Sequence, residues 1–288
     1  MERVLIVGAG FMGSGIAQVC AQAGYQVALM DIQPEVTERA LKNIGWSVEK
    51  LVAKGVLKES SQQILARISP EKNLSSAVQA DWVIEAALEE EQLKRGIFQE
   101  LDRTCRPETI LATNTSSIPI TRLAANTTRP ERVLGLHFFG PVPLMRLVEV
   151  VKGEQTSPQV FERGVAFVQS LGKTPLRVQR DVPGFVMNRI FSAAFREAVE
   201  LVEQGITTPE DIDAGMRLGY GWSAGPFEIA DLAGLDTVAR VGQSLRALGE
   251  NHLAHSPGLI ERMVAEGNLG RKVGKGFYRY TPDGKRMT

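Results

Sequence analysis

The sequence predicts a doubly wound α/β domain followed by an all-helical domain. Between residues 3 and 178, short apolar runs typical of buried strands alternate with amphipathic runs typical of helices. This alternation predicts a mostly parallel sheet covered by helices. From Pro183 onward, long helical patterns such as residues 185–204 appear and strand-like runs nearly vanish. We therefore expect two domains, residues 1–182 and residues 183–288.

The elements of the first domain follow in a regular order. Strands are expected at residues 3–8, 25–31, 82–85, 109–113, 132–137, 147–151 and 174–178. Helices are expected at residues 14–23, 34–51, 89–104 and 158–171. Gly24 ends the first helix, and Pro34 suits the first turn of the second.

Composition and charge exclude several classes of protein. The 288 residues are 43% hydrophobic and 23% charged, with 33 basic and 33 acidic side chains. A net charge of zero argues against a dedicated nucleic-acid-binding protein. No run approaches the ~20 apolar residues of a membrane helix, and the N-terminus lacks the layout of a signal peptide. We expect a cytoplasmic protein with neither nucleic acid nor membrane as a partner. Two cysteines without a C-x-x-C spacing predict neither a disulfide scaffold nor a zinc site.

A glycine-rich turn follows the first strand directly. Gly8, Gly10 and Gly13 form G-x-G-x-x-G, and Asp31 ends the next strand 18 residues after Gly13. This spacing is typical of the Rossmann-type dinucleotide site, where the pyrophosphate lies at a helix N-terminus and the acid binds the ribose. Asp31 would repel a 2′-phosphate, so the cofactor expected is NAD rather than NADP. The motif alone leaves FAD open, as well as a plain glycine turn beside a surface aspartate.

Polar side chains at the strand ends are the candidates for chemistry. His137 ends an apolar strand, at the edge where such sheets bind ligands. Glu149 lies in the following apolar strand, where a buried carboxylate needs a partner, and His137 is one candidate. The alternatives are a buried histidine bonded to backbone and an edge-strand glutamate facing water. Ser116 lies in Asn-Thr-Ser-Ser after another strand, where it could equally cap a helix. Asn188, in Asp-Val-Pro-Gly-Phe-Val-Met-Asn-Arg, is expected to face the cleft or to be a polar residue within a hinge helix.

Two further histidines are three residues apart. A metal site at His252 and His255 is conceivable, but no acidic or cysteine partner for it is evident. A solvated loop is the better interpretation, and no metal site is predicted.

Taken together, six segments of the chain resemble the L-3-hydroxyacyl-CoA dehydrogenase family, and within it the stand-alone bacterial 3-hydroxybutyryl-CoA branch. They are GAGFMGSGIA at 8–17, NTSS at 114–117, GLHFFGPVPLMRLVEV at 135–150, DVPGFVMNR at 181–189, GPFE at 225–228 and GRKVGKGFYRY at 270–280. The resemblance covers nearly the whole chain. It implies an NAD-dependent oxidoreductase that interconverts an (S)-3-hydroxyacyl-CoA of short chain with the 3-oxoacyl-CoA, in fatty acid metabolism, and a homodimer formed through the second domain.

The resemblance also implies roles for single residues. His137 would be the general base, Glu149 its orienting partner, and Ser116 and Asn188 would bind substrate near the reacting carbon. Further cofactor contacts of the family match Glu89, Lys94, Ser116 and Lys272, and coenzyme A contacts match Ser47 and Lys54.

One residue departs from the family pattern. The family usually has HFFNP where this chain has His137-Phe-Phe-Gly140-Pro, so a side-chain amide near the reacting groups is missing. Two other functions remain open at this point: a dehydrogenase of free hydroxy acids or phosphorylated sugar acids, for which Arg189, Arg196 and Arg217 would supply charge, and a catalytically silent NAD-binding protein.

Overall fold

The computed structural model describes residues 2–254 and 258–287. The chain forms two compact units that divide between Phe185 and Val186. Of the two histidines three residues apart, His255 lies outside the described residues. Among the described residues, no helix is both long and apolar enough to cross a membrane.

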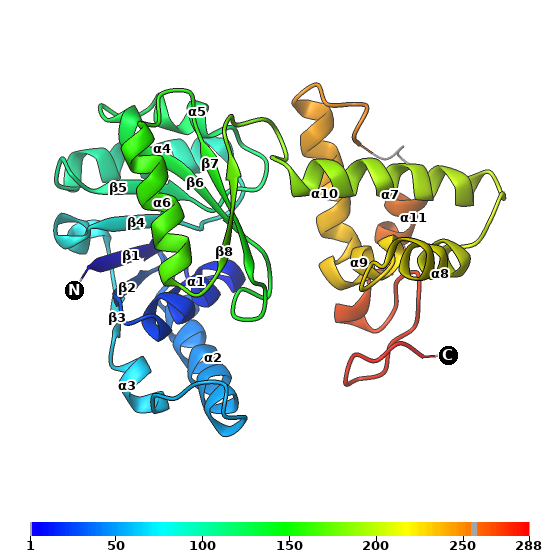
Figure 1. Cartoon of the computed structure of the whole chain (residues 1–288), viewed down its shortest axis with the longest axis horizontal. Coiled ribbons are helices and arrows are strands. Elements are labelled where there is room, and N and C mark those ends of the chain that lie inside the picture. Colours follow the sequence, from blue (N-terminus) through cyan, green and yellow to red (C-terminus); the bar gives the residue numbers. More distant parts are fainter. Residues whose placement is uncertain (1, 255–257, 288) are drawn as a thin grey trace. The chain divides into compact units, whose positions relative to one another are not determined.

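The first unit is built on one eight-stranded sheet (Figure 1). Its strands are β1 (Arg3–Val7), β2 (Gln26–Met30), β3 (Ile68–Glu71), β4 (Trp82–Glu85), β5 (Ile110–Thr113), β6 (Val133–Phe138), β7 (Leu147–Lys152) and β8 (Thr174–Val178). The order is β3-β2-β1-β4-β5-β6-β7-β8, and every pair is parallel except β6 with β7. From β1 the chain first adds β2 and β3 on one side of the sheet and then continues with β4 on the other side. This order confirms the doubly wound topology and places the switch point between the carboxyl ends of β1 and β4.

Helices cover the sheet in two layers. They are α1 (Phe11–Gln22), α2 (Pro34–Ala53), α3 (Ser61–Leu65), α4 (Glu91–Thr104), α5 (Ile120–Ala124) and α6 (Pro158–Ser170), with short 3-10 turns η1 (Leu74–Gln79) and η2 (Pro130–Arg132). Residues of α1, α2 and α6 share one apolar cluster with alternate strand residues such as Val4 and Ile6. The remaining strand residues, such as Leu5, point to the opposite face, because side chains alternate along a strand.

The short helices α3 and α5 were not predicted, and two further differences concern the sheet and the glycine turn. Strand β3 was not expected, because Ser69 and Pro70 interrupt its apolar pattern; it is an edge strand, where proline is tolerated. Helix α1 begins at Phe11, three residues before the predicted start. Its first turn contains Gly13, which has a low helix propensity, and the close approach of the Gly8 carbonyl leaves no room for a side chain there.

The second unit is helical, as predicted. It contains α7 (Met187–Glu203), α8 (Pro209–Tyr220), α9 (Pro226–Ala233), α10 (Leu235–Ala247), α11 (Leu259–Ala265) and the 3-10 turn η3 (Arg271–Val273). Its core includes Phe195, Phe227 and Phe277, whose rings meet edge to face. Such pairs add to the stabilisation that burial of the rings provides.

Two buried aspartates join the segments of the helical unit. Asp213 accepts hydrogen bonds from the N–H groups of Phe227 and Glu228 and from Tyr278 Oη. Asp231 accepts hydrogen bonds from the backbone of Phe277 and Tyr278 and from Tyr280 Oη. The GPFE and GRKVGKGFYRY segments therefore contribute directly to the fold of this unit.

Candidate active site

The glycine turn between β1 and α1 leaves no room for side chains at two of its glycines. Gly8 has φ of +102°, and a Cβ there would lie 2.6 Å from the Ala86 carbonyl oxygen. A Cβ at Gly13 would lie 1.8 Å from the Gly8 carbonyl oxygen. A Cβ at Gly10, in contrast, would meet no atom within 4 Å. Protein backbone thus packs tightly against Gly8 and Gly13, whereas the space beside Gly10 is empty. Gly10 lies next to the N–H groups of the first turn of α1.

Asp31 lies beside this turn, directly after β2. Its Oδ2 accepts a hydrogen bond from Ala9 N at 2.9 Å, and its Oδ1 accepts one from Gln33 N at 3.0 Å. These two bonds orient the carboxylate at the carboxyl edge of the sheet. A pyrophosphate fits against the glycine turn and the N–H groups at the start of α1, and the neighbouring Asp31 carboxylate fits a ribose diol.

A buried ion pair lies under the next strand ends. Glu85, the last residue of β4, accepts hydrogen bonds from Lys94 Nζ, Ala87 N and Thr113 Oγ1, each at 2.7 Å. Both charged side chains are at most 1% exposed. Lys94 also donates to the Ala87 carbonyl and lies 3.4 Å from Glu89, so its ammonium group is surrounded by protein acceptors. Lys94 is thus enclosed by protein, whereas its neighbour Glu89 is partly exposed.

Glu89 organises the turn that carries Ser116. Its Oε1 accepts hydrogen bonds from Thr115 Oγ1 at 2.6 Å, from Ser116 N at 2.9 Å, and from the N–H and hydroxyl of Ser117, both at 3.1 Å. Burial alone would raise the pKa of Glu89, but the charge of Lys94 and these hydrogen bonds outweigh it and hold the pKa below its ordinary value. The ionised carboxylate thus positions the Ser116 hydroxyl.

His137 and Glu149 form a hydrogen bond across the antiparallel strands β6 and β7. They are direct partners in the register, and His137 Nδ1 lies 2.6 Å from Glu149 Oε2. Strand β7 lies between β6 and β8, and Glu149 is 0% exposed. The interpretation of Glu149 as an edge-strand residue facing water is therefore wrong. Since the carboxylate accepts the proton of Nδ1, Nε2 of the neutral imidazole is left with a free lone pair.

Aromatic rings surround the imidazole of His137. The centroid of the Phe139 ring lies 4.6 Å from that of His137, and the centroid of the Phe185 ring lies 5.7 Å away. Phe185 has φ of +47°, which is uncommon for a residue with a side chain. Asn114 accepts a hydrogen bond from Phe138 N at 2.9 Å and so joins the end of β5 to the residue after His137.

The remaining predicted residues lie elsewhere. In the helical unit, Asn188 lines an apolar pocket of about 120 Å³ together with Phe191, Ser192, Val238 and Val241. Lys272, in η3 of that unit, forms an ion pair with Asp236. On α2, Ser47 is half-buried and Lys54 is exposed just after the last turn.

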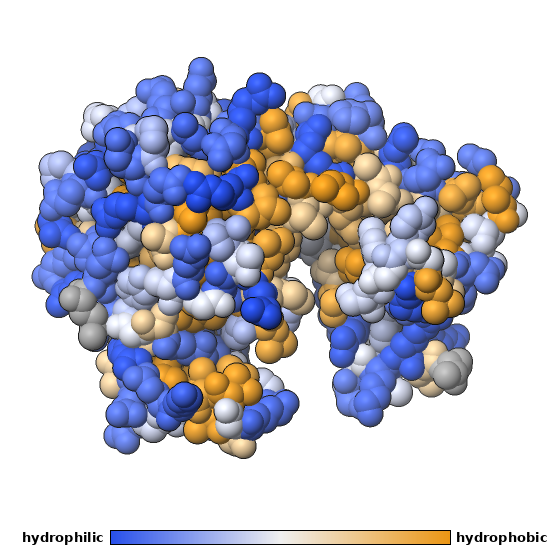
Figure 2. Space-filling model, viewed as in Figure 1, coloured by the Kyte–Doolittle hydropathy of each residue, from blue (hydrophilic) through white to orange (hydrophobic). Residues whose placement is uncertain are grey.

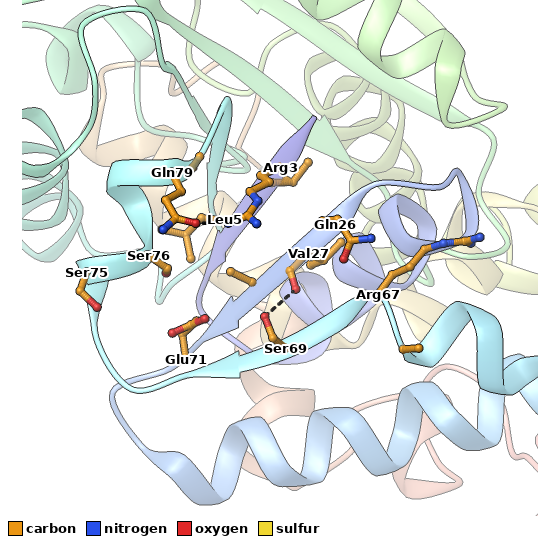
Figure 3. Close-up of a pocket in the computed structure, with 14 residues that line it drawn as sticks. Arg3, Leu5, Gln26, Val27, Arg67, Ser69, Glu71, Ser75, Ser76 and Gln79 are labelled. Atoms are coloured by element: carbon orange, nitrogen blue, oxygen red, sulfur yellow. Dashed lines mark hydrogen bonds between the residues drawn. The ribbon is translucent and has the colours of Figure 1, made fainter. Parts of the chain in front are cut away.

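A larger cleft lies near the amino ends of the strands. It has a volume of about 380 Å³ and is lined by residues of β1, β2, β3 and η1, among them Arg3, Gln26 and Ser69 (Figure 3). Its arginines are engaged: Arg3 with Gln79, and Arg67 with Glu59. Ligands of doubly wound sheets bind at the opposite, carboxyl edge, so we do not assign the active site to this cleft.

Sequence reasoning missed Glu85 and gave Asn114 no role of its own. The signal for Glu85 is an acid at the end of the apolar run Trp82–Glu85, nine residues before a lysine. For Asn114, the signal is an amide directly after a buried strand, the place where polar side chains of neighbouring strands meet.

Comparisons with known proteins agree with this arrangement. The family model "3-hydroxyacyl-CoA dehydrogenase, NAD binding domain" matches residues 3–182, and the model for the C-terminal domain of the same family matches residues 184–280. A probable 3-hydroxybutyryl-CoA dehydrogenase of Bacillus subtilis is 43% identical over 282 residues, which is 97% of this chain and 98% of that protein. A probable 3-hydroxybutyryl-CoA dehydrogenase of Deinococcus radiodurans is 44% identical over 276 residues, which is 96% of this chain and 99% of the relative.

Solved structures show the same similarity. The (S)-3-hydroxybutyryl-CoA dehydrogenase PaaH1 of Ralstonia eutropha superposes with a TM-score of 0.90 at 41% identity, covering 98% of this chain and 99% of that one. M. tuberculosis FadB2 superposes with a TM-score of 0.91 at 39% identity and the same coverage. The chain, with its NAD-binding sheet and its helical C-terminal unit, therefore belongs to the 3-hydroxyacyl-CoA dehydrogenase family.

Proposed function

We propose that this NAD-dependent dehydrogenase oxidises (S)-3-hydroxybutyryl-CoA to the 3-oxoacyl-CoA and catalyses the reverse reduction, with His137 and Glu149 as its acid–base pair. The observation that carries the proposal is the 2.6 Å contact between His137 Nδ1 and the fully buried Glu149 at the carboxyl edge of the NAD-binding sheet. The relatives named for 3-hydroxybutyryl-CoA support the choice of substrate.

The first unit offers the groups that NAD requires. The backbone of Gly8, Gly10 and Gly13 leaves the space in which a pyrophosphate fits, and Asp31 would bind the adenosine ribose. Ser116 lies in the turn after β5, and Glu89, in the turn after β4, accepts its backbone hydrogen bond. We propose both, together with Lys94 and Lys272, as residues of the cofactor site. Bound NAD would accept the hydride from carbon 3 of the substrate.

The mechanism assigns one task to each polar side chain. His137 Nε2 takes the hydroxyl proton during oxidation and returns it during reduction. Glu149 keeps the proton of Nδ1 in place and stabilises the imidazolium that forms. Ser116 and Asn188 hydrogen-bond the substrate oxygen as it becomes a carbonyl oxygen.

We propose that the acyl chain of the substrate is short, because relatives that are 41–44% identical over nearly the whole chain are named for 3-hydroxybutyryl-CoA. We propose Ser47 and Lys54, on α2, as the residues that bind the coenzyme A moiety.

The test is the absorbance of NADH in the presence of acetoacetyl-CoA or free acetoacetate. Oxidation of NADH with the thioester alone supports the proposal. Oxidation with the free acid would instead favour a hydroxy-acid dehydrogenase, and no oxidation with either compound would indicate a silent NAD-binding protein. A series of 3-oxoacyl-CoA substrates from four to ten carbons then measures the preference for chain length.

We also propose that the enzyme is a homodimer formed by the helical unit and works in the cytoplasm. The helical unit exposes large apolar side chains, including Ile190, Leu218 and Tyr220, which are 56%, 88% and 79% exposed. Apolar side chains also gather along α7 in Figure 2. Burial of such surface stabilises association. Light scattering should give twice the 31.5 kDa mass of one chain at micromolar concentration, and a single-chain mass would contradict the dimer.

A further inference from the structure

Phe11 exposes a large aromatic ring at the glycine turn. It is the first residue of α1 and directly follows Gly10, yet its side chain is 70% exposed. Exposed apolar side chains are common on protein surfaces, so the position of this ring at the glycine turn, and not its exposure alone, is what points to a role.

The ring lies against Gly140. A Cβ built at Gly140 would lie 2.6 Å from Phe11 Cε1, 3.4 Å from Phe11 Cζ and 3.4 Å from Met12 Sδ. The nearest of these distances is too short for any real Cβ, so the ring occupies the space where a side chain at position 140 would begin. The absence of a side chain at Gly140 therefore leaves the space that the Phe11 ring occupies.

The pair lies between two parts of the proposed site. Phe11 belongs to the turn where a pyrophosphate fits, and Gly140 lies three residues after His137, which marks the reacting carbon. In a dinucleotide, the nicotinamide riboside is the part that joins the pyrophosphate to the reacting carbon of the ring. If the pyrophosphate lies at this turn and the reacting ring lies near His137, the nicotinamide riboside would pass beside the Phe11 ring, which lies next to Gly140.

We propose that the exposed ring of Phe11 is an apolar support for the nicotinamide riboside and that Gly140 is the residue that makes room for this ring. The inference rests on the proposed function, because it assumes that NAD binds at the glycine turn. It also explains the departure from the HFFNP pattern: this chain has an aromatic contact where the family pattern has a side-chain amide.

The experiment measures NADH affinity by fluorescence titration of the full chain and needs no substrate. Phe11→Ala should raise the Kd of NADH about tenfold, as expected when ~50 Å² of apolar contact is lost. The Tm of the protein without cofactor should stay within about 3 °C, because the ring is exposed. Val78→Ala, an exposed apolar residue of η1, is the matched control and should leave the Kd unchanged.

A double-mutant cycle tests the pairing itself. Gly140→Asn should weaken NADH binding about tenfold in the wild-type background, because the new Cβ displaces the ring. In a Phe11→Leu background the same change should cost less than about twofold, because leucine has no atoms where Cε1 and Cζ lie. Gly96→Asn, at a glycine of α4 with no atom near its Cβ position, is the control for the added side chain.

The outcomes separate this inference from the proposed function. If the wild type binds NADH but Phe11→Ala binds it equally well, the support by Phe11 is refuted and the proposed function stands. Equal losses from Gly140→Asn in both backgrounds would refute the pairing. Failure of the wild type to bind NADH would refute both. Should Gly140→Asn not fold, Gly140→Ala introduces the same Cβ and takes its place.

Discussion

Replacing Glu149 by glutamine tests the acid–base pair without changing the shape of the site. The substitution keeps a hydrogen-bonding group opposite His137 Nδ1 but removes the negative charge. Glu149 is 0% exposed and lies 2.6 Å from Nδ1, so solvent cannot replace the lost interaction. The effect should appear when His137 carries the substrate proton and is positively charged.

The size of the effect follows from the two kinds of hydrogen bond. A hydrogen bond to a charged group contributes about 1.5–3 kcal/mol, and one between neutral groups about 0.5–1.5 kcal/mol. The difference of about 1.3 kcal/mol applies to the imidazolium in the transition state, which corresponds to about a tenfold loss in kcat. Glutamine can also present its amide N–H to Nδ1, which would leave the wrong tautomer and increase the loss.

The assay is the single-turnover rate of NAD reduction with (S)-3-hydroxybutyryl-CoA, the direction in which neutral His137 gains the proton, since single turnover separates the chemical step from product release. A primary isotope effect with substrate deuterated at carbon 3 verifies that hydride transfer limits the rate. The Tm of the variant serves as the folding control. A rate within twofold of wild type, with the isotope effect present, would refute the role of Glu149 in stabilising protonated His137.

Four further outcomes are expected. His137→Gln should lower kcat by about 10²–10⁴, the usual contribution of a positioned acid–base group; a single-turnover rate within a few-fold of wild type would exclude this base. Asp31→Ser should narrow the preference for NAD over NADP, measured as a ratio of kcat/KM values, because a like charge no longer opposes the 2′-phosphate; an unchanged ratio would place Asp31 away from the ribose. The pKa of Glu89 is lowered in the folded protein, so its stabilising contribution is complete above the ordinary value of 4.5 and is lost as the pH falls through the lowered pKa; Glu89→Gln should flatten the fall of Tm with acid, and an identical acid profile would contradict this. Tyr278→Phe removes the 2.7 Å hydrogen bond to Asp213 and should lower the free energy of unfolding of the helical unit by about 1.5–3 kcal/mol in urea denaturation; no shift in the midpoint would mean that this bond does not stabilise the unit.

The dinucleotide motif and the strand ends could be predicted from the sequence because their signals are local. Gly8, Gly10 and Gly13 have a fixed spacing, and a parallel sheet brings His137 and the Asn-Thr-Ser-Ser turn to the same edge as the glycines. For Glu149 the rule that a carboxylate in an apolar strand needs a partner offered His137 as one candidate, and the resemblance to the family implied the pairing. The first two inferences needed only the order of elements and the chemistry of single residues.

The parts that could not be predicted depend on distant contacts. The position of Lys94 is one example, because a lysine in an amphipathic helix usually faces water. Only the packing of α4 against the sheet brings it within 2.7 Å of Glu85. The short strand β3 is another example, since its pairing with β2 decides its structure despite Ser69 and Pro70. Likewise, the collision between a side chain at Gly140 and the ring of Phe11 is visible only in three dimensions.

The single antiparallel pair in the sheet has a consequence for folding. A parallel neighbour would be reached only through a long crossover, but β6 returns directly as β7, so His137 and Glu149 are 12 positions apart. The contacts of Thr113 with Glu85 and of Thr121 with Asp181 span 28 and 60 positions. The entropy of loop closure grows with the length of chain enclosed, so the hairpin brings its two key residues together at a lower entropic cost than these other contacts. The proposed acid–base geometry is thus formed within one hairpin, by two residues that are direct partners in its register.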